Sequence, residues 1–455
     1  MASNLTRIPL RFNHNYKRSG IKSYVWLLRK YNIHPTKEGP YFSGGHVHTQ
    51  GKYGKGGLHE FHDHEHVPDQ QQQQPIGGDV TADDQQNDSM WLCPVGIGTP
   101  AQTVNLDFDT GSSDLWVWST ELPKNTLSQS SEGHNVFNPA KSSSWKKLTG
   151  STWKIQYGDN SSASGDVGTD TLNVGGISVE GQAVELAKQM SAQFVQSAGD
   201  GLLGLAWGQL NTIKPTPQKT PVENMVAQKG ISQALFTAYL GSWRDANEAD
   251  KGESFYTFGY IDQDTLKANG NAQPSYTPVD TSQGFWQFNS ASYSINGKTI
   301  QRSGNTAIAD TGTTLALVED SVVDAIYKAI PGAKYDSTNQ GYVFPAKTKA
   351  AQLPDVAFAV GNKLFHVQKE DLGFADAGNG MIYGGIQSRG DLDFDILGGT
   401  FLKGVYAVCL SSHPSLSRAD VKRSSTWATS ASALFSASRR SRTLPCRRPR
   451  ALSEA

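Results

Sequence analysis

The chain is poor in cysteine and has no long apolar run. Its three cysteines, Cys93, Cys409 and Cys446, cannot pair completely, and no two have CxxC spacing, so neither a disulfide framework nor a cysteine zinc site is predicted. Without a run of about 18 apolar residues, we expect no transmembrane helix. The first seven residues lack the apolar core of a secretory signal. We therefore expect either that the protein is not exported by that route or that the start of the sequence is incomplete.

Positive charge is scarce in the middle of the chain and concentrated at its ends. Residues 1–78 carry a net charge of +5 and residues 411–455 a net charge of +7, whereas residues 79–410 carry −13. Basic ends can indicate nucleic-acid or membrane binding. A basic segment attached to an acidic body more simply predicts that one docks on the other.

The composition divides the chain into a body and two flanking segments. Residues 1–78 comprise a basic stretch, with helix-like apolar spacing over 21–31, and a His- and Gln-rich linker. Histidines 59, 62, 64 and 66 in that linker could form a metal site, but solvated imidazoles in a disordered segment are the favoured interpretation. Residues 411–455 are rich in Ser and Arg and are predicted to be disordered.

The body, residues 79–410, is predicted to be mostly β. Short alternating apolar runs such as Val104 to Phe108 and Trp153 to Tyr157 are separated by Gly, Asn, Asp and Ser turns. Helices are expected only as short pieces, near Pro221–Gln228 and Ser321–Ile330.

One motif occurs twice in this body. Asp109-Thr110-Gly111-Ser112-Ser113 and Asp310-Thr311-Gly312-Thr313-Thr314 each follow a short apolar strand. One copy alone would be an ordinary turn. Two copies about one domain length apart predict a duplicated lobe that brings two carboxylates face to face, the arrangement needed for acid–base activation of a water molecule.

Further motifs surround these two in a familiar order. They are Leu115-Trp116-Val117, Tyr157-Gly158-Asp159, Asp200-Gly201-Leu202-Leu203-Gly204 and Ile396-Leu397-Gly398-Gly399. With them, residues 79–410 resemble the pepsin family of aspartic proteases, and most closely the fungal penicillopepsin and aspergillopepsin group. The resemblance implies a mainly β, bilobal acid-protease fold with few short helices and two pseudo-twofold-related lobes flanking a cleft. Residues 79–265 would form the N-terminal lobe with its flap, and residues 266–410 the C-terminal lobe.

The resemblance assigns roles around the two aspartates. Asp109 and Asp310 would be catalytic and share one proton, because close like charges cannot both ionise cheaply, for which aspartic proteases are themselves the standard example. Supporting roles fall to the rest of the two motifs: the threonines hold the loops together, the glycines allow close approach, and Ser112 and Thr313 bond the outer carboxylate oxygens. These supporting residues are Thr110, Gly111, Ser112, Thr311, Gly312 and Thr313.

Substrate contacts are implied on a hairpin over Trp153 to Gly165, which resembles the family's flap. Tyr157 would cover the peptide with its hydroxyl near Trp116, and Gly158 and Asp159 would supply hydrogen bonds. Asp159, with Asp107, resembles the subgroup that accepts Lys as well as large apolar residues before the scissile bond. An exposed hairpin acid without a role remains the alternative for Asp159.

The basic N-terminal segment resembles the family's propeptide. Lys30 and Tyr31 match the Lys-Tyr pair near its end, so Lys30 would lie between the catalytic carboxylates and keep the enzyme inactive until acid releases it. A solvated basic helix is the alternative.

The end of the chain departs from the family. The family's last C-lobe strand does not appear after Tyr406-Ala407-Val408, and the Ser- and Arg-rich tail looks like a shifted reading frame or an unspliced intron. A missing strand would expose an unpaired sheet edge. The leading interpretation is an acid-active aspartic endopeptidase made as a zymogen. The alternative is a catalytically impaired pepsin-like protein that binds peptides in its cleft.

Partners and compartment follow from the same resemblance. It implies peptide or protein substrates, a propeptide in cis, a monomer, a secreted or vacuolar location, and no metal or cofactor. Membrane binding is not expected. Nucleic-acid binding through the arginine-rich tail is a weaker alternative, because aromatic residues are not interleaved with the arginines.

Overall fold

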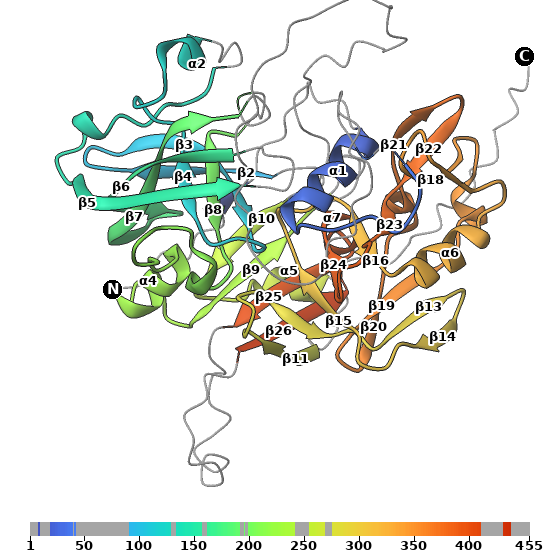
Figure 1. Ribbon diagram of the computed structural model, residues 1–455. Coiled ribbons are helices and arrows are strands. Elements are labelled where there is room, and N and C mark those ends of the chain that lie inside the picture. Colours follow the sequence, from blue (N-terminus) through green and yellow to red (C-terminus); the bar gives the residue numbers. More distant parts are fainter. Residues whose placement is uncertain are drawn as a thin grey trace, which may run out of the picture.

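The computed structural model describes residues 8–9, 19–39, 41, 91–128, 133–156, 162–191, 195, 199–241, 254–268, 275–410 and 431–437. Figure 1 shows two β-rich lobes, one built from the cyan and green part of the chain and the other from the yellow and orange part. Helix α1 (Gly20–Lys30) lies across the top between them (Figure 1). The mainly β, bilobal fold predicted from the sequence is confirmed.

The first lobe contains a seven-stranded sheet in the order β2-β3-β8-β4-β7-β6-β5. Its strands are β2 (Leu92–Ile97), β3 (Gln102–Asp109), β4 (Leu115–Val117), β5 (Lys146–Gln156), β6 (Ser162–Val174), β7 (Ile177–Met190) and β8 (Gly201–Gly204). The long β6–β7 hairpin turns through Gly175 and Gly176, both at positive φ. Two such glycines suit the tight turn whose twist matches that of the flanking strands.

The second lobe carries two four-stranded antiparallel sheets, in the orders β14-β13-β19-β20 and β17-β18-β22-β21. The first consists of β13 (Ser292–Ile295), β14 (Lys298–Gln301), β19 (Val356–Val360) and β20 (Lys363–His366). The second consists of β17 (Lys334–Asp336), β18 (Gly341–Pro345), β21 (Gly373–Gly378) and β22 (Met381–Gly384).

An eleven-stranded sheet extends from the junction of the lobes into the second lobe, in the order β1-β10-β9-β25-β26-β11-β12-β15-β24-β16-β23. Its strands before the second lobe's aspartate are β1 (Ile8–Pro9), β9 (Leu235–Tyr239), β10 (Phe255–Phe258), β11 (Ser275–Asp280), β12 (Gln287–Asn289) and β15 (Thr306–Ala309). The later ones are β16 (Ala316–Val318), β23 (Ile386–Ser388), β24 (Asp395–Leu397), β25 (Val405–Leu410) and β26 (Ala431–Ala437).

The helices are short, as predicted. They are α1, α2 (Lys124–Ser128), α4 (Pro221–Ala227), α5 (Gln263–Ala268), α6 (Asp320–Lys328) and α7 (Gly399–Leu402). Helix α4 begins with Pro at its first position and a capping box in which Thr220 and Glu223 bond each other's backbone amides. The helices predicted near residues 221–228 and 321–330 are therefore confirmed. The predicted lobe boundary after residue 265 falls inside α5.

The two lobes repeat one arrangement of strands. Strand β8 pairs parallel with β3 and antiparallel with β4, and β24 pairs parallel with β15 and antiparallel with β16. Strand β8 ends in Leu202-Leu203-Gly204, with Gly204 opposite Asp109, and Ile396-Leu397 at the end of β24 is followed by Gly398. On the other side, Asp310 donates its backbone N–H to Leu397. The duplicated architecture predicted from the two motifs is present.

The tail contains a strand that the sequence did not predict. Residues 431–437 form β26, which pairs antiparallel with β25 on one side and with β11 on the other. The prediction of a disordered tail is therefore wrong for these residues, because backbone pairing with two neighbouring strands decides their conformation. The sheet does not end at β25.

Candidate active site

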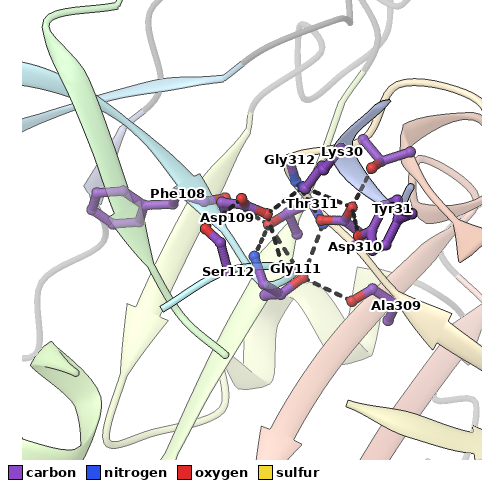
Figure 2. Close-up of polar contacts among 12 residues, drawn as sticks. Lys30, Tyr31, Phe108, Asp109, Gly111, Ser112, Ala309, Asp310, Thr311 and Gly312 are labelled. Atoms are coloured by element: carbon purple, nitrogen blue, oxygen red, sulfur yellow. Dashed lines mark hydrogen bonds and ion pairs between the residues drawn. The ribbon is translucent and has the colours of Figure 1, made fainter. Parts of the chain in front are cut away.

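The two motif aspartates lie where two strands end. Asp109 is the last residue of β3, and Asp310 follows β15 directly. Both are almost fully buried, with exposed fractions of 2% and 0%. Figure 2 shows that the side chains of Asp109 and Asp310 approach each other from the two loops.

The two threonines bond the loops together reciprocally. The backbone N–H of Thr110 donates to Thr311 Oγ1 at 3.0 Å, and that of Thr311 donates to Thr110 Oγ1 at 2.9 Å. Each hydroxyl then donates across the lobe junction, Thr110 to the carbonyl of Ala309 and Thr311 to that of Phe108. All of these groups are buried, so each pairing avoids an unsatisfied polar group at the interface.

Further donors fix the carboxylates. Ser112 Oγ donates to Asp109 Oδ2 at 2.6 Å, and Thr313 Oγ1 donates to Asp310 Oδ2. Backbone N–H groups bond the other oxygens, Gly111 to Asp109 at 2.8 Å and Gly312 to Asp310 at 3.0 Å.

The glycines are needed for close approach across the junction. A Cβ at position 111 would lie 2.6 Å from Asp310 Oδ1, and one at Gly312 would collide with Asp109. Only a residue without a side chain fits at either place.

Lys30 and Tyr31, at the end of α1, reach the same point. Lys30 Nζ lies 2.9 Å from Asp109 Oδ1 and 2.9 Å from Asp310 Oδ2 (Figure 2). The Tyr31 hydroxyl also donates to Asp310 Oδ2. The Lys30 side chain is 5% exposed, so its ammonium sits between the two carboxylates and away from water. A solvated basic helix, the alternative considered for this segment, does not describe these contacts.

The pKa values of the cluster move in different directions. Burial would raise the pKa of Asp109, but Lys30, with hydrogen bonds from Asp310 and Ser112, lowers it below its ordinary value. Burial raises the pKa of Asp310 to about 6, although Lys30 opposes it. Burial alone would lower the pKa of Lys30, and the two aspartates instead raise it well above its ordinary value. One carboxylate therefore ionises much more easily than the other.

The predicted substrate-contact residues lie partly in the described region. Trp116 is buried and stacks on Trp153 with ring centroids 6.1 Å apart. Asp107 is buried two residues before Asp109, and its Oδ1 has no hydrogen-bond partner among the described residues. Burial and the charge of Asp109 raise the pKa of Asp107 well above its ordinary value. Tyr157, Gly158 and Asp159 lie outside the described residues, between the paired ends of β5 and β6 at Gln156 and Ser162.

A second set of contacts, which the sequence did not reveal, follows α1. His34 bonds Asp391 through its backbone N–H at 2.8 Å and through Nδ1 at 2.9 Å. Two residues further on, Thr36 Oγ1 donates to Asp320 at 2.6 Å, and Lys37 Nζ lies 2.8 Å from Asp324. Asp320 and Asp324 belong to α6 in the second lobe. The opposite charges of the N-terminal segment and the body were the available signal, but they did not identify the partners.

The site is built from carboxylates and hydroxyls. Among the described residues, no group of three or more His, Cys, Asp or Glu side chains is placed to hold a metal ion. In the same part of the chain, no helix has the length and apolar character needed to span a membrane. Two carboxyls with different proton affinities at one point can together remove and supply protons.

Comparisons with known proteins agree with this geometry. The model of the eukaryotic aspartyl protease family matches residues 90–421. Aspergillopepsin-1 of Aspergillus oryzae is 44% identical over 340 residues, covering 74% of this chain and 80% of the relative. Endothiapepsin of Cryphonectria parasitica is 44% identical, covering 70% of this chain and 72% of the relative. Penicillopepsin-1 of Penicillium janthinellum is 43% identical, covering 72% and 94%. This chain belongs to the eukaryotic aspartyl protease family, and it is an aspartic endopeptidase of the pepsin type.

Proposed function

We propose that the chain hydrolyses peptide bonds at acid pH with Asp109 and Asp310 as a water-activating pair. The observation that carries this proposal is the convergence of both carboxylates on one point, each 2.9 Å from the same nitrogen of Lys30. When Lys30 leaves, a water and a scissile carbonyl take the space between the carboxylates.

In the proposed reaction, the ionised carboxylate accepts a proton from the water while the water oxygen bonds to the carbonyl carbon. The protonated carboxyl donates its proton to the carbonyl oxygen, which gives a neutral gem-diol without a covalent enzyme intermediate. The carboxyl that took the proton of the water then donates it to the amide nitrogen, while the other carboxylate removes a proton from a hydroxyl of the gem-diol. The C–N bond breaks, an acid and an amine leave, and the two carboxyls return to their starting protonation.

The basic N-terminal segment acts as an inhibitor in cis. This is supported by the burial of Lys30 between the aspartates and by the bonds of His34, Thr36 and Lys37 to acidic residues of the second lobe. With Lys30 and Tyr31 in place, a peptide cannot reach the carboxylates. The chain is therefore a zymogen in this arrangement.

Large apolar residues are the proposed preference before the scissile bond, with Lys also accepted. Buried Trp116 and Leu202 support the apolar preference, and the unbonded oxygen of Asp107 supports a site for a cation. A lysine that ionises Asp107 would gain a partner otherwise absent from the described residues. Asp159 would contribute a second carboxylate if it lies over the cleft.

The alternative of a catalytically impaired peptide-binding protein is less well supported. It depends on a missing strand after β25, whereas β26 pairs along the full length of β25. We further propose a monomer that acts on peptide or protein substrates and is either secreted or vacuolar.

The test is cleavage of a denatured protein substrate at about pH 3–5, where one carboxyl of the pair can be ionised while the other is protonated. Replacing Asp109 or Asp310 by Asn should lower the rate by about 10²–10⁴-fold. Asp280→Asn, at an exposed position, is the control and should keep the parent rate. Parent activity in either active-site variant would overturn the proposal.

A further inference from the structure

Two other carboxyl groups meet inside the first lobe. Asp114 lies two residues after Ser112, and Glu185 projects from the middle of β7. Their exposed fractions are 2% and 1%, and Asn211 between them is 6% exposed. Asn211 Nδ2 donates to Asp114 Oδ1 at 2.8 Å and to Glu185 Oε1 at 3.1 Å.

No cation balances these two carboxyls among the described residues. Asp114 Oδ1 also accepts the backbone N–H of Thr212 at 2.7 Å, whereas Glu185 Oε2 has no hydrogen-bond partner in the described part of the chain. Two ionised carboxylates around one neutral amide would be costly in a buried site. Two buried carboxyls that bond the same amide, one of them with an oxygen that lacks a partner, are less costly when the pair retains a proton than when both are ionised.

Other charged groups on the neighbouring elements have their own partners. Asp166 of β6 pairs with Lys147 and Lys188 on the surface. Glu223 of α4 accepts the backbone N–H groups of Gly208 and Thr220. The charge that acts on Glu185 comes from Asp114.

We propose that Asp114 and Glu185 share one proton, and that this second carboxyl pair holds the Asp109 loop in place only while the proton is retained. Both are positioning residues, since neither touches the reacting atoms. The inference rests on the proposed function only where it concerns activity; the shared proton and its effect on folding stand independently.

The link to the active site is short. Asn211 also lies 3.4 Å from the carbonyl of Ser113, and the carbonyl of Asp114 accepts the backbone N–H of Gly204 at 2.8 Å. Ser112, in the same loop, bonds Asp109 directly and accepts the backbone N–H of Ala206. Repulsion between Asp114 and Glu185 would therefore push on the segment that orients Asp109.

The direction of the pH effect follows from the pKa shifts. Burial raises the pKa of Asp114 to about 6, and burial with the charge of Asp114 raises that of Glu185 well above its ordinary value. In the unfolded chain both groups ionise at about pH 4. The folded state therefore binds more protons above that pH, and the stability contributed by the pair is lost as pH rises through the folded values.

Glu185→Gln tests the proposal because the amide cannot ionise while keeping the shape of a protonated carboxyl. Tryptophan fluorescence of the full chain between about pH 3 and 8 gives the midpoint of neutral-pH unfolding. We expect Glu185→Gln to move this midpoint upward by about one pH unit. In a plot of proteolysis rate against pH, the decline at high pH should move upward as well. Glu180→Gln, at an exposed position of the same strand, should keep the parent midpoint.

Asp114→Asn is the second variant and should also move the midpoint upward. If Glu185→Gln does not fold, Asp114→Asn decides the question alone. A midpoint equal to or lower than the parent's in every variant that folds would overturn the proposal. If the proposed peptidase activity itself is wrong, no variant will cleave substrate at any pH, whereas the unfolding midpoints will still respond as stated.

Discussion

Thr110 and Thr311 exchange backbone-to-side-chain hydrogen bonds across the junction of the two lobes, at 3.0 and 2.9 Å. Each residue stands immediately after its aspartate, so the exchange sets the separation of the two carboxylates. A pairing of this kind makes the two halves of the site depend on each other: a change on one loop is transmitted to the other through buried hydrogen bonds.

Thr110→Val should therefore damage both stability and activity. Valine keeps the shape but removes the acceptor for Thr311 N–H and the donor for the carbonyl of Ala309. Leaving such buried groups unpaired costs about 1–3 kcal/mol each. We expect the free energy of unfolding to fall by about 2 kcal/mol or more in urea titrations. Thr120→Val, at an exposed position, is the control, and equal losses in the two variants would contradict the assigned role.

Lys30→Met should weaken self-inhibition. The variant leaves two buried carboxylates without their cation, so the docked form of α1 loses stability while the released form does not. We expect the full chain to begin cleaving a fluorogenic peptide at a pH about one unit higher than the parent. Lys22→Met removes the same charge about two turns earlier on the same helix and should leave the onset unchanged. An unchanged onset for Lys30→Met would favour a passive basic helix.

The direction of acid release can be assigned to particular carboxyls. The pKa values of Asp109 and Asp324 are lowered, partly by Lys30 and Lys37. Their contribution to docking is present above the ordinary carboxyl pKa of about 4 and is lost as pH falls through the lowered values. Asp310, whose pKa is raised, acts in the opposite direction. Release of the N-terminal segment in acid therefore depends mainly on protonation of Asp109. The contact of Lys37 with Asp324 contributes less, because the Asp324 side chain is 54% exposed.

Much of the catalytic half of the site could be predicted from the sequence, because the chemistry is carried by contiguous residues. A strand followed by Asp-Thr-Gly fixes its own loop, and a second copy predicts the partner. The capped start of α4 is local in the same way. In each case, residues within about one turn or one hairpin decide the conformation.

The rest depends on residues brought together from distant positions. Nothing in the sequence around Glu185 distinguishes it from other polar residues of β7, and only the fold brings Asp114 and Asn211 to it. The pairing of Lys37 with Asp324 likewise spans most of the chain. Strand β26 is an extreme case, since its Ser- and Ala-rich sequence has weak strand preference and its conformation follows from its neighbours.

The contribution of β26 can be measured by truncation. A chain ending at residue 410 would leave β25 and β11 with unpaired backbone groups on facing edges, whereas a chain ending at residue 440 keeps the strand. At about 0.5–1.5 kcal/mol per backbone hydrogen bond, the shorter chain should lose more than about 3 kcal/mol of unfolding free energy relative to the longer one. Thermal unfolding of the two chains provides the comparison. Equal stability would mean that β26 does not complete the sheet in solution.

The strand behind Asp310 is supported by a buried ion cluster, which provides the last prediction. Asp395 of β24 lies 2.7 Å from Arg302 Nη1 and 2.6 Å from Arg389 Nη1, and all three residues are buried. Asp395→Asn keeps the shape but leaves Arg302 without a counter-charge among the described residues, and it leaves Arg389 with Glu319 alone, at 3.9 Å. Breaking a buried ion pair in this way lowers the free energy of unfolding by about 3–5 kcal/mol. We expect to measure this loss by denaturation with guanidinium chloride.

Asp355→Asn is the matched control, because Asp355 pairs with His366 at the surface, where both side chains are about half exposed. An exposed pair of this kind contributes less than about 1 kcal/mol. Because Asp395 lies opposite Ala307 in the parallel pairing of β24 with β15, its loss should also disturb the loop that carries Asp310. The rate of peptide cleavage by Asp395→Asn should therefore fall at temperatures where the variant is still folded. An unchanged rate there would confine the cluster to a structural role.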